Sequence, residues 1–245
     1  MDILLRETAD LIKKSDFTIA FTGAGISVES GIPPFRGEHG LWNKYDPKVL
    51  DLGYYFLNEE KCWFVIREIF YDFFANASPN NAHFVLAEME QKGYLKSIVT
   101  QNIDNLHYEA GSKVVHEFHG NSKKLKCPEC GTIYEASEFD FKKLPPLCKN
   151  DKSILKPDFI FFGEGIPPDA YKNSFADAEK AKVCIIVGST GEVTPASYVP
   201  HTAKRNGAVI IEINPEKSRF TNSITDIYLQ GRAAVVLENI AGYLF

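Results

Sequence analysis

The glycine-rich segment TGAGISVESGIPPFRG, residues 22–37, is the first part of the chain whose residue types could do chemistry. It follows the apolar run FTIAFT, so Gly23 and Gly25 stand where a predicted strand ends. Glycines there let a ligand approach the backbone, free N–H groups suit phosphate, and Arg36 could add a bidentate contact. The third glycine of G-x-G-x-x-G is missing, since residue 28 is Val28, and no acidic residue ends a second strand about 20 positions on. The segment by itself therefore indicates only a nucleotide.

Two later apolar runs end in small or polar residues in the same way. IIVGST ends at Gly188 and Ser189, and AVIIEINPE ends at Asn214 and Glu216. The carboxyl ends of parallel strands meet at one edge of a sheet, where open α/β folds bind dinucleotides. We therefore expect a dinucleotide across that edge to meet Gly23, Gly188 and Asn214 in turn.

The segment TQNIDNLHYEAG follows another predicted strand and is dense in amides and acids. Gln101, Asn102, Asp104 and Asn105 are more polar groups than one helix N-cap needs, so they indicate a polar pocket. Further on, His119 precedes Gly120 at the end of the run VVHEFHG. An imidazole with its ordinary pKa of about 6.5 can take a hydroxyl proton at neutral pH, which makes His119 the candidate general base.

Three cysteines and one aspartate have the spacing of a structural zinc site. Cys127-Pro-Glu-Cys130 forms one knuckle, and Cys148-Lys-Asn-Asp151 follows it with Asp151 in the place of a fourth cysteine. Zinc accepts a carboxylate, so these four side chains could close a tetrahedron that leaves no open position for a catalytic water. The alternative is a lobe that has lost tight metal binding.

The elements that must position these residues alternate between strands and helices, which is typical of a doubly wound parallel α/β sheet. The predicted strands are 17–22, 96–100, 114–120, 182–188 and 208–213, and the predicted helices are 3–14, 58–76, 80–92, 168–181, 195–206 and 232–243. Two insertions interrupt the alternation and predict a smaller lobe, with a helical module at 38–78 and a zinc module at 121–160. The large Rossmann-type domain would then comprise 1–37, 79–120 and 161–245.

The composition is that of an ordinary globular protein. A net charge of -5 and a pI near 5.7 argue against unaided binding of nucleic acid, for which a basic face is usual. No run approaches the roughly 20 apolar residues of a membrane span, and the charged start MDILLRETADLIKK predicts an amphipathic helix instead of a signal peptide. Cys62 and Cys184 lie alone in apolar runs and are expected in the core. These features predict a cytoplasmic protein that binds neither nucleic acid nor a membrane.

The motifs taken together resemble the sirtuins in order and spacing over nearly the whole chain. They are GAGIS with ESGIPPFRG, TQNIDNLH, HG at 119–120, the cysteine knuckles, KPDFIFFGE at 156–164, GST at 188–190 and INPE at 213–216. The resemblance implies an NAD-dependent protein-lysine deacetylase with a Rossmann-type large domain and a small lobe of zinc and helical modules. NAD would be consumed, yielding nicotinamide, free lysine and O-acetyl-ADP-ribose.

The resemblance also implies roles for individual residues. The acyl oxygen of the modified lysine attacks C1′ of the nicotinamide ribose, giving an alkylimidate, and His119 acts as general base on the ribose hydroxyls. Asn102 orders the ribose and a nearby water, Asp104 with Ile103 holds the nicotinamide carboxamide, and Phe35 shields the reactive ribose face. The positions assigned to NAD are Gly23, Ala24, Gly25, Ser27, Glu29, Pro33, Phe35, Arg36, Trp42, Gln101, Asn102, Ile103, Asp104, His119, Gly188, Ser189, Thr190, Val193, Asn214, Pro215, Glu216 and Ala233.

An acetylated-lysine peptide or protein would bind as a strand added between residues 162–164 and 191–193. The positions assigned to this substrate are Ile160, Phe162, Gly163, Glu164 and Val193. A Tyr and an Arg that accompany preference for acidic acyl groups are replaced here by Ile66 and Ile69, so acetyl or longer apolar acyl groups are expected. The segment from Ser27 to Gly37 is expected to be a mobile loop over the cofactor.

Three departures from the sirtuin pattern and several rival functions accompany this interpretation. Asp151 replaces a cysteine, Pro34 stands where Asp or Thr is common, and GST replaces GTS. A mono-ADP-ribosyltransferase shares the same nicotinamide cleavage, and a deacylase preferring longer apolar groups shares the whole site. A dehydrogenase would need a standard fingerprint and a hydride partner, and a non-enzymatic NAD sensor would have no need of His119.

Overall fold

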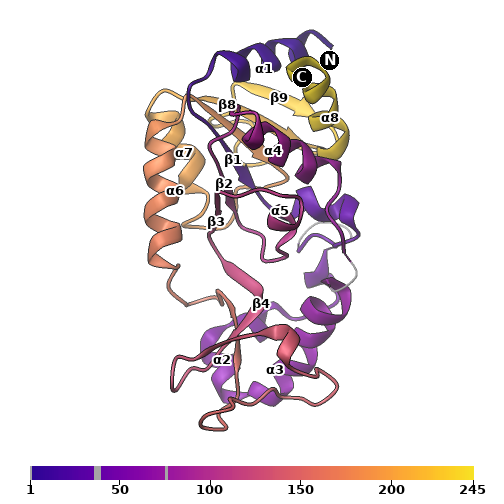
Figure 1. The fold of residues 1–245 in the computed structure, drawn as a ribbon, viewed down its shortest axis with the longest axis vertical. Coiled ribbons are helices and arrows are strands. Elements are labelled where there is room, and N and C mark those ends of the chain that lie inside the picture. Colours follow the sequence, from indigo (N-terminus) through magenta and orange to yellow (C-terminus); the bar gives the residue numbers. More distant parts are fainter. Residues whose placement is uncertain (1, 36–39, 75–76) are drawn as a thin grey trace.

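The computed structural model describes residues 2–35, 40–74 and 77–245 (Figure 1). Its main sheet has six strands in the order β3-β2-β1-β7-β8-β9. These strands are β1 Thr18–Thr22, β2 Ser97–Thr100, β3 Val115–Glu117, β7 Val183–Val187, β8 Val209–Asn214 and β9 Ile227–Gln230. All five neighbouring pairs are parallel, as the near-continuous apolar runs predict.

The register brings the carboxyl ends of the central strands level with one another. Thr22 at the end of β1 pairs with Thr100 at the end of β2 on one side and with Val187 at the end of β7 on the other. Val187 in turn pairs with Ile213 of β8. The polar residues that follow these strands therefore emerge along a single edge of the sheet.

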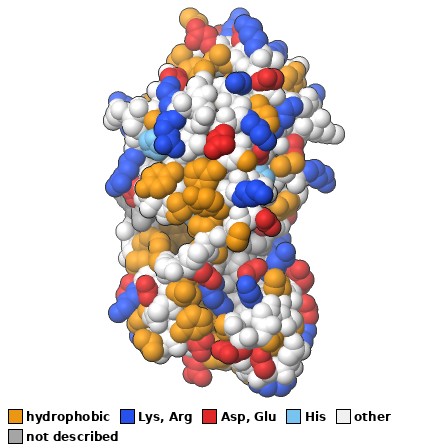
Figure 2. All heavy atoms as spheres, turned by 90° about the vertical axis from the view of Figure 1, so that its left-hand side faces the viewer, with side chains coloured by type: hydrophobic (Ala, Val, Ile, Leu, Met, Phe, Trp, Pro, Cys, Tyr) orange, Lys and Arg blue, Asp and Glu red, His pale blue; other side chains and the backbone are white. Residues whose placement is uncertain are grey.

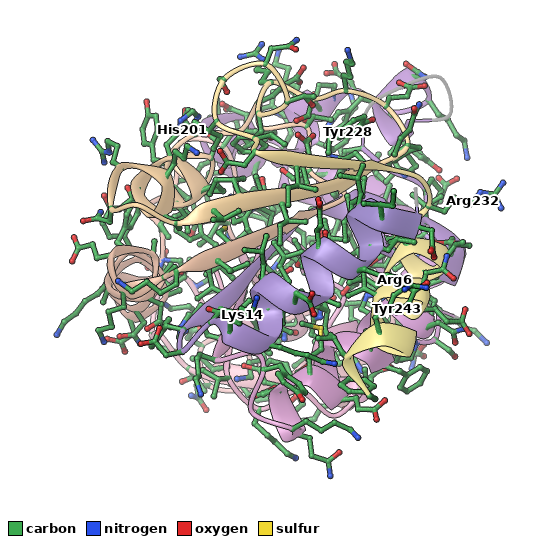
Figure 3. The ribbon with its side chains drawn as sticks, turned by 90° about the horizontal axis from the view of Figure 1, so that it is seen from above. Arg6, Lys14, His201, Tyr228, Arg232 and Tyr243 are labelled. Carbon is green, nitrogen blue, oxygen red and sulfur yellow. The ribbon has the colours of Figure 1, made fainter. Side chains whose placement is uncertain are left out.

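Helices cover both faces of this sheet, which buries apolar side chains on each side (Figure 1). One face packs against α1 Asp2–Lys14, α4 Asn81–Gln91 and α8 Ala233–Leu244, and the other against α6 Pro168–Lys180 and α7 Tyr198–Arg205. Seen from above, Arg6 of α1 and Tyr243 of α8 lie together (Figure 3), with the guanidinium 5.1 Å from the ring centre. This contact joins the two ends of the chain.

The doubly wound fold and most of its elements agree with the sequence predictions, with three corrections. The strand predicted at 114–120 stops at Glu117, because residues 118–119 turn away from the sheet before β4 begins at Gly120. The helix predicted at 58–76 is α3 Glu59–Ile66 followed by a π-helical stretch, η4 Arg67–Phe73. Strand β9 was missed because it is short and lies at the sheet edge, with only Leu229 of its four residues buried.

A second sheet of three antiparallel strands, in the order β5-β4-β6, lies in the lower lobe (Figure 1). The elements of the lower lobe are η2 Leu41–Asn43, η3 Pro47–Leu50, α2 Leu52–Leu57, α3, η4, β4 Gly120–Lys126, β5 Ile133–Glu135, η6 Ala136–Glu138 and β6 Lys156–Phe159. The two sequence insertions share one core, because Tyr55 OH and Trp63 Nε1 both donate to Leu155 O, at 3.0 and 2.8 Å. The exact domain boundaries drawn from the sequence stay a prediction.

The lone cysteines behave as predicted, since Cys62 and Cys184 are fully buried. Ile66 and Ile69 are also fully buried, within the core of the lower lobe. Within the described ranges no helix is long and apolar enough to cross a membrane.

Candidate active site

The glycines after β1 are required by the neighbouring strand end. Gly23 N donates to Val187 O at 3.0 Å, and Gly25 N donates to Gly188 O at 2.9 Å. A Cβ on Gly25 would stand 2.6 Å from Gly188 Cα, and one on Gly188, whose φ is +64°, would stand 2.3 Å from Ile26 N. Close contact between two backbones, in addition to any ligand, therefore excludes side chains here.

The chain after Gly23 forms a short 3₁₀ helix, η1 Ala24–Ser30. The first four residues of the segment expected to be a mobile loop therefore lie in a 3₁₀ helix: Ser27 is fully buried, and the left-handed Gly31, with φ of +86°, ends the helix. Arg36 and Gly37 lie outside the described residues.

Ser27 is the centre of a buried polar cluster, which we call the Ser27 cluster and define as Ser27, His83, Asn102, Asp104 and His107. Ser27 Oγ donates to Asp104 Oδ2 at 2.7 Å and accepts from Asn102 Nδ2 at 3.2 Å. Burial raises the pKa of the Asp104 carboxyl above its ordinary value, while the bond from Ser27 opposes the rise. Asp104 also orients the next helix, α5 Leu106–Glu109, by accepting from Leu106 N at 3.0 Å.

Two histidines of the cluster are buried in their neutral form. Burial lowers the pKa of His83 to about 4 and that of His107 well below its ordinary value. Their rings lie 5.0 Å apart, His83 Nε2 is 3.5 Å from Ser27 Oγ, and His107 Nε2 is 2.9 Å from Thr22 Oγ1. Since Asn80 N donates to His83 Nδ1 at 3.3 Å, the proton of His83 lies on Nε2, which points at Ser27.

His119 lies at the turn between β3 and β4 with its protonation state defined. Its Nδ1 is 3.0 Å from Gln101 O, and a carbonyl oxygen can only accept, so Nδ1 carries the proton. Burial lowers the pKa of His119, although the Gln101 bond opposes this, and the ring is therefore neutral at neutral pH. Nε2 consequently keeps a lone pair with which it can accept a proton.

Gln101 and Ser189 join the ends of β2 and β7, because Gln101 Nε2 donates to Ser189 Oγ at 2.8 Å. Asn214, at the end of β8, donates to Ser189 O at 3.2 Å and to Glu212 Oε1 at 2.9 Å. The structure thus brings together the predicted residues of four strand ends along one edge.

Beneath Asn214 lies a second buried carboxylate, Glu212, which is fully inaccessible to solvent. It accepts hydrogen bonds from Ser218 Oγ at 2.6 Å and Thr225 Oγ1 at 2.7 Å, and Thr221 Oγ1 bridges both of its oxygens at 3.0 and 2.9 Å. The loop between β8 and β9 is folded around this carboxylate. We call Glu212, Asn214, Ser218, Thr221 and Thr225 the Glu212 cluster.

Other predicted positions lie farther from these clusters or face other partners. Phe35 packs on Trp42, with ring centres 5.3 Å apart, beside the core of the lower lobe. Glu29 Oε2 accepts from Ala234 N at 2.8 Å, so its carboxylate caps α8 next to Ala233. Ile103 is buried in the lower-lobe core, and its carbonyl accepts from Ser122.

The remaining predicted cofactor positions are held mainly through their backbones. Thr190 O accepts from Arg219 N at 3.1 Å, Val193 O from Ser197 N at 2.9 Å, and Pro215 O from Gln230 Nε2 at 3.1 Å. Glu216 is exposed beside the Glu212 cluster, and Pro33 is half-buried. Ala24 is the first residue of η1.

The predicted substrate residues form a turn after β6 that touches both lobes. Ile160 N donates to His119 O at 2.8 Å, while Phe162 pairs with the start of α2 through Leu50 O and Leu52 N. Gly163 has φ of +88°, which suits glycine. The carboxylate of Glu164, a predicted substrate position, accepts from Phe161 N at 2.9 Å and pairs with Lys156.

The cysteine motif forms two matched knuckles. Gly131 N donates to Cys127 O at 3.0 Å, and Lys152 N donates to Cys148 O at 3.1 Å, with both donors in the left-handed conformation. The ligand atoms of Cys127, Cys130, Cys148 and Asp151 all lie within 4.8 Å of one another. Asp151 therefore occupies in the second knuckle the position that Cys130 occupies in the first, and this donor set fits a tetrahedral metal.

Sequence reasoning missed His83, Glu212 and Lys156 as parts of the site. A charged residue inside the apolar strand AVIIEIN, followed by the hydroxyl-rich SRFTNSIT, was a usable signal for Glu212. His83 gave no comparable signal, since a histidine in the first turn of an amphipathic helix is common. The role of Lys156 depends on tertiary contacts alone.

The strand order, with its reversal between β1 and β7 and the polar cluster at that edge, defines a Rossmann-type nucleotide-binding protein with an added lobe. A profile of the Sir2 family matches residues 23–195, and the chain belongs to this family. It is 40% identical to an "NAD-dependent protein deacylase" of Thermococcus sibiricus, over 97% of this chain and 95% of the relative. It is 39% identical to "NAD-dependent protein deacetylase 1" of Pyrobaculum aerophilum, over 98% and 96%.

Solved structures agree with this assignment. A chain described under the structural basis for the mechanism and regulation of Sir2 enzymes superposes with a TM-score of 0.92 at 40% identity, covering 100% of this chain and 98% of its own. A Sir2 chain described with p53 peptide and NAD+ has a TM-score of 0.89 at 34% identity, covering 96% of each chain. A histidine-to-alanine Sir2 variant with deacetylated p53 peptide and 3′-O-acetyl ADP-ribose has a TM-score of 0.91 at 32% identity, covering 97% of each.

Proposed function

We propose that this protein is an NAD-dependent protein-lysine deacetylase that converts acetyl-lysine and NAD to lysine, nicotinamide and O-acetyl-ADP-ribose. The observation that carries the proposal is the neutral His119, whose Nδ1 proton is held by Gln101 O while Nε2 keeps its lone pair. A base of this kind can take a proton from a ribose hydroxyl. A hydride-transferring enzyme does not need to deprotonate the ribose of its cofactor. Because the acyl group ends on ADP-ribose, the reaction is a transfer.

The two polar clusters along the sheet edge would hold opposite ends of NAD. The Ser27 cluster presents Asn102 and Asp104 near His119, and is the candidate site for the nicotinamide ribose and its carboxamide. The Glu212 cluster presents Asn214 beside Ser189 and is the candidate adenosine site. The backbones at Gly23 and Gly188 lie between the two, where the pyrophosphate would cross.

The acyl-lysine peptide would lie beside the turn at residues 160–164. Figure 2 shows a hollow on one side of the molecule between the upper and lower lobes, with hydrophobic side chains gathered above it. Tyr171 and Tyr198, at the starts of α6 and α7, are exposed hydrophobic side chains. A β-strand added next to Gly163 would be recognised mainly through its backbone.

We also propose that the cysteine motif binds structural zinc through Cys127, Cys130, Cys148 and Asp151. The fit of three thiols and one carboxylate to a closed tetrahedron supports this assignment. A cytoplasmic location suits it, because thiolate ligands must stay reduced. Metal analysis of purified protein tests the proposal: we expect about one zinc per chain, and protein without zinc would overturn it.

The reaction is tested by mass spectrometry of NAD incubated with peptides that carry acetyl, longer apolar and acidic acyl groups on lysine. We expect equal amounts of nicotinamide, free lysine and O-acyl-ADP-ribose, with little turnover of acidic acyl groups. Transfer of ADP-ribose to protein without lysine deacylation would instead establish a mono-ADP-ribosyltransferase. NADH formation would establish a dehydrogenase.

A further inference from the structure

The turn at residues 160–164 is organised by a buried lysine at the start of β6. The side chain of Lys156 is only 9% exposed, and its Nζ lies 2.9 Å from Glu164 Oε2. The same ammonium donates to Pro157 O at 2.9 Å and to Phe159 O at 2.7 Å. An ammonium has three donors, so these three acceptors use all of them.

The acceptors of Lys156 lie on both sides of the turn. Phe159 O belongs to β6, whose next residue, Ile160, donates to His119 O. Glu164 closes the other side, since its carboxylate accepts from Phe161 N and its own N–H donates to Phe161 O at 3.0 Å. Lys156 Nζ also lies 4.2 Å from the centre of the Phe161 ring. One buried cation therefore connects the strand that supports His119 to the turn beside it.

We propose that Lys156 is a positioning residue for deacetylation, which together with Glu164 fixes residues 160–164 in the shape that accepts the acyl-lysine peptide. The inference rests on the proposed function. Glu164 then acts on the peptide through the turn, because its carboxylate is directed to Lys156 and to Phe161 N.

Neutralising Lys156 would remove its pairing with Glu164 and one of its three donors. Burial lowers the pKa of Lys156 below its ordinary value of 10.5, while the neighbouring Glu164 and Asp158 oppose this and Lys126 adds to it. The turn should therefore loosen at alkaline pH, below the pH at which an exposed lysine loses its proton.

The test compares Lys156→Met and Lys156→Arg with the matched control Lys142→Met, which removes an exposed lysine from the same lobe. We expect Lys156→Met to raise the KM for peptide roughly tenfold or more, since charged hydrogen bonds are lost, and to leave the KM for NAD nearly unchanged. Lys156→Arg should restore most of the peptide affinity. It should also abolish the alkaline rise of peptide KM that we expect in the wild type, because arginine stays charged.

Other outcomes are equally decisive. A wild-type peptide KM in Lys156→Met, or equal rises of KM for peptide and NAD, would overturn the inference. If Lys156→Met does not fold, Glu164→Gln, checked by thermal melting and NAD binding, must show the same selective loss, and normal peptide KM in that variant would overturn it. Failure of the proposed function itself is distinguished by wild-type protein that releases no free lysine from any acyl-lysine peptide.

Discussion

The Ser27 cluster and the Glu212 cluster, the two halves of the sheet edge, each contain one buried carboxylate. The two carboxylates differ in their hydrogen-bond partners. Glu212 receives hydrogen bonds from Asn214, Ser218, Thr221 and Thr225. Asp104 receives one side-chain hydroxyl, from Ser27, and the backbone of the next helix, and burial raises its pKa.

We infer from this difference that the Glu212 cluster stabilises the fold and that the Ser27 cluster takes part in the reaction. Several neutral donors around Glu212 satisfy the charge and fold the β8–β9 loop about it, so the cluster is built for rigidity. The Ser27 cluster instead holds a carboxylate with a raised pKa beside the neutral His83 and His107, and His119 lies close along the same edge. Groups with perturbed pKa values concentrate where reactions occur. Substitutions in the Ser27 cluster should therefore lower mainly activity, and substitutions in the Glu212 cluster should lower mainly stability.

The largest effect is expected from His119→Ala. Removing the base should lower deacetylation at least ~100-fold, the usual scale of general base catalysis, while the fold and NAD binding remain. Steady-state kinetics with acetyl-lysine peptide and direct titration with NAD measure the two properties. His201→Ala, on α7, is the matched control and should keep normal turnover. Near-normal turnover in His119→Ala would refute the assignment of the base.

Asp104→Asn should be the next most damaging to activity. A charged hydrogen bond to the proposed nicotinamide carboxamide is lost, which predicts roughly a 10- to 100-fold fall in kcat/KM for NAD. Because burial opposes the charged form of Asp104, replacing it with a neutral amide should lower the free energy of unfolding by only about 1 kcal/mol. Kinetics and denaturant unfolding report both, with the exposed Asp10→Asn as control. A large loss of stability with little loss of activity would reverse the roles given to the two halves.

Glu212→Gln should show the opposite pattern. The amide keeps the shape but cannot accept from every donor in the cluster, so the free energy of unfolding should fall by about 3 kcal/mol. For a chain of this size that is a decrease in Tm of roughly 6–12 °C. Turnover per folded molecule at saturating NAD should change less than in Asp104→Asn. Unchanged melting, relative to the exposed Glu179→Gln, would show that the cluster does not stabilise the fold.

Much of this comparison was predictable from the sequence, because strand ends of a parallel sheet must share one edge. Gly23, Gln101, Gly188 and Asn214 could be placed there from apolar runs and the residues that follow them. The resemblance then supplied roles that spacing alone does not give. The separation of the edge into two clusters was not predictable, because it depends on side chains far apart in sequence, such as Ser27 and Asp104.

Two contacts within the site could not be predicted from the sequence, because they depend on tertiary structure. Glu164 was assigned to substrate binding through the sirtuin resemblance, and the structure adds that its carboxylate pairs with a buried lysine eight residues earlier. Ser27 was placed at the start of the expected mobile loop, and the structure adds that it is fully buried and donates a hydrogen bond to Asp104. In both cases the partner lies in another element, and local pattern carries no information about it.

The smallest effect, and the finest test of the neutral histidines, is the pH dependence of stability. His83 has a pKa of about 4 when folded and an ordinary value of 6.5 when unfolded, so between these pH values the unfolded chain binds more protons and stability falls as pH falls. His83→Gln removes this titration and keeps a side chain that can complete the N-terminal capping box with Asn80. From pH 7.5 to 5.5 the wild type should lose about 1 kcal/mol more than the variant, as measured by urea unfolding. Equal losses in the two proteins would mean that folding leaves the pKa of His83 at its ordinary value, which would contradict a His83 held neutral in the Ser27 cluster.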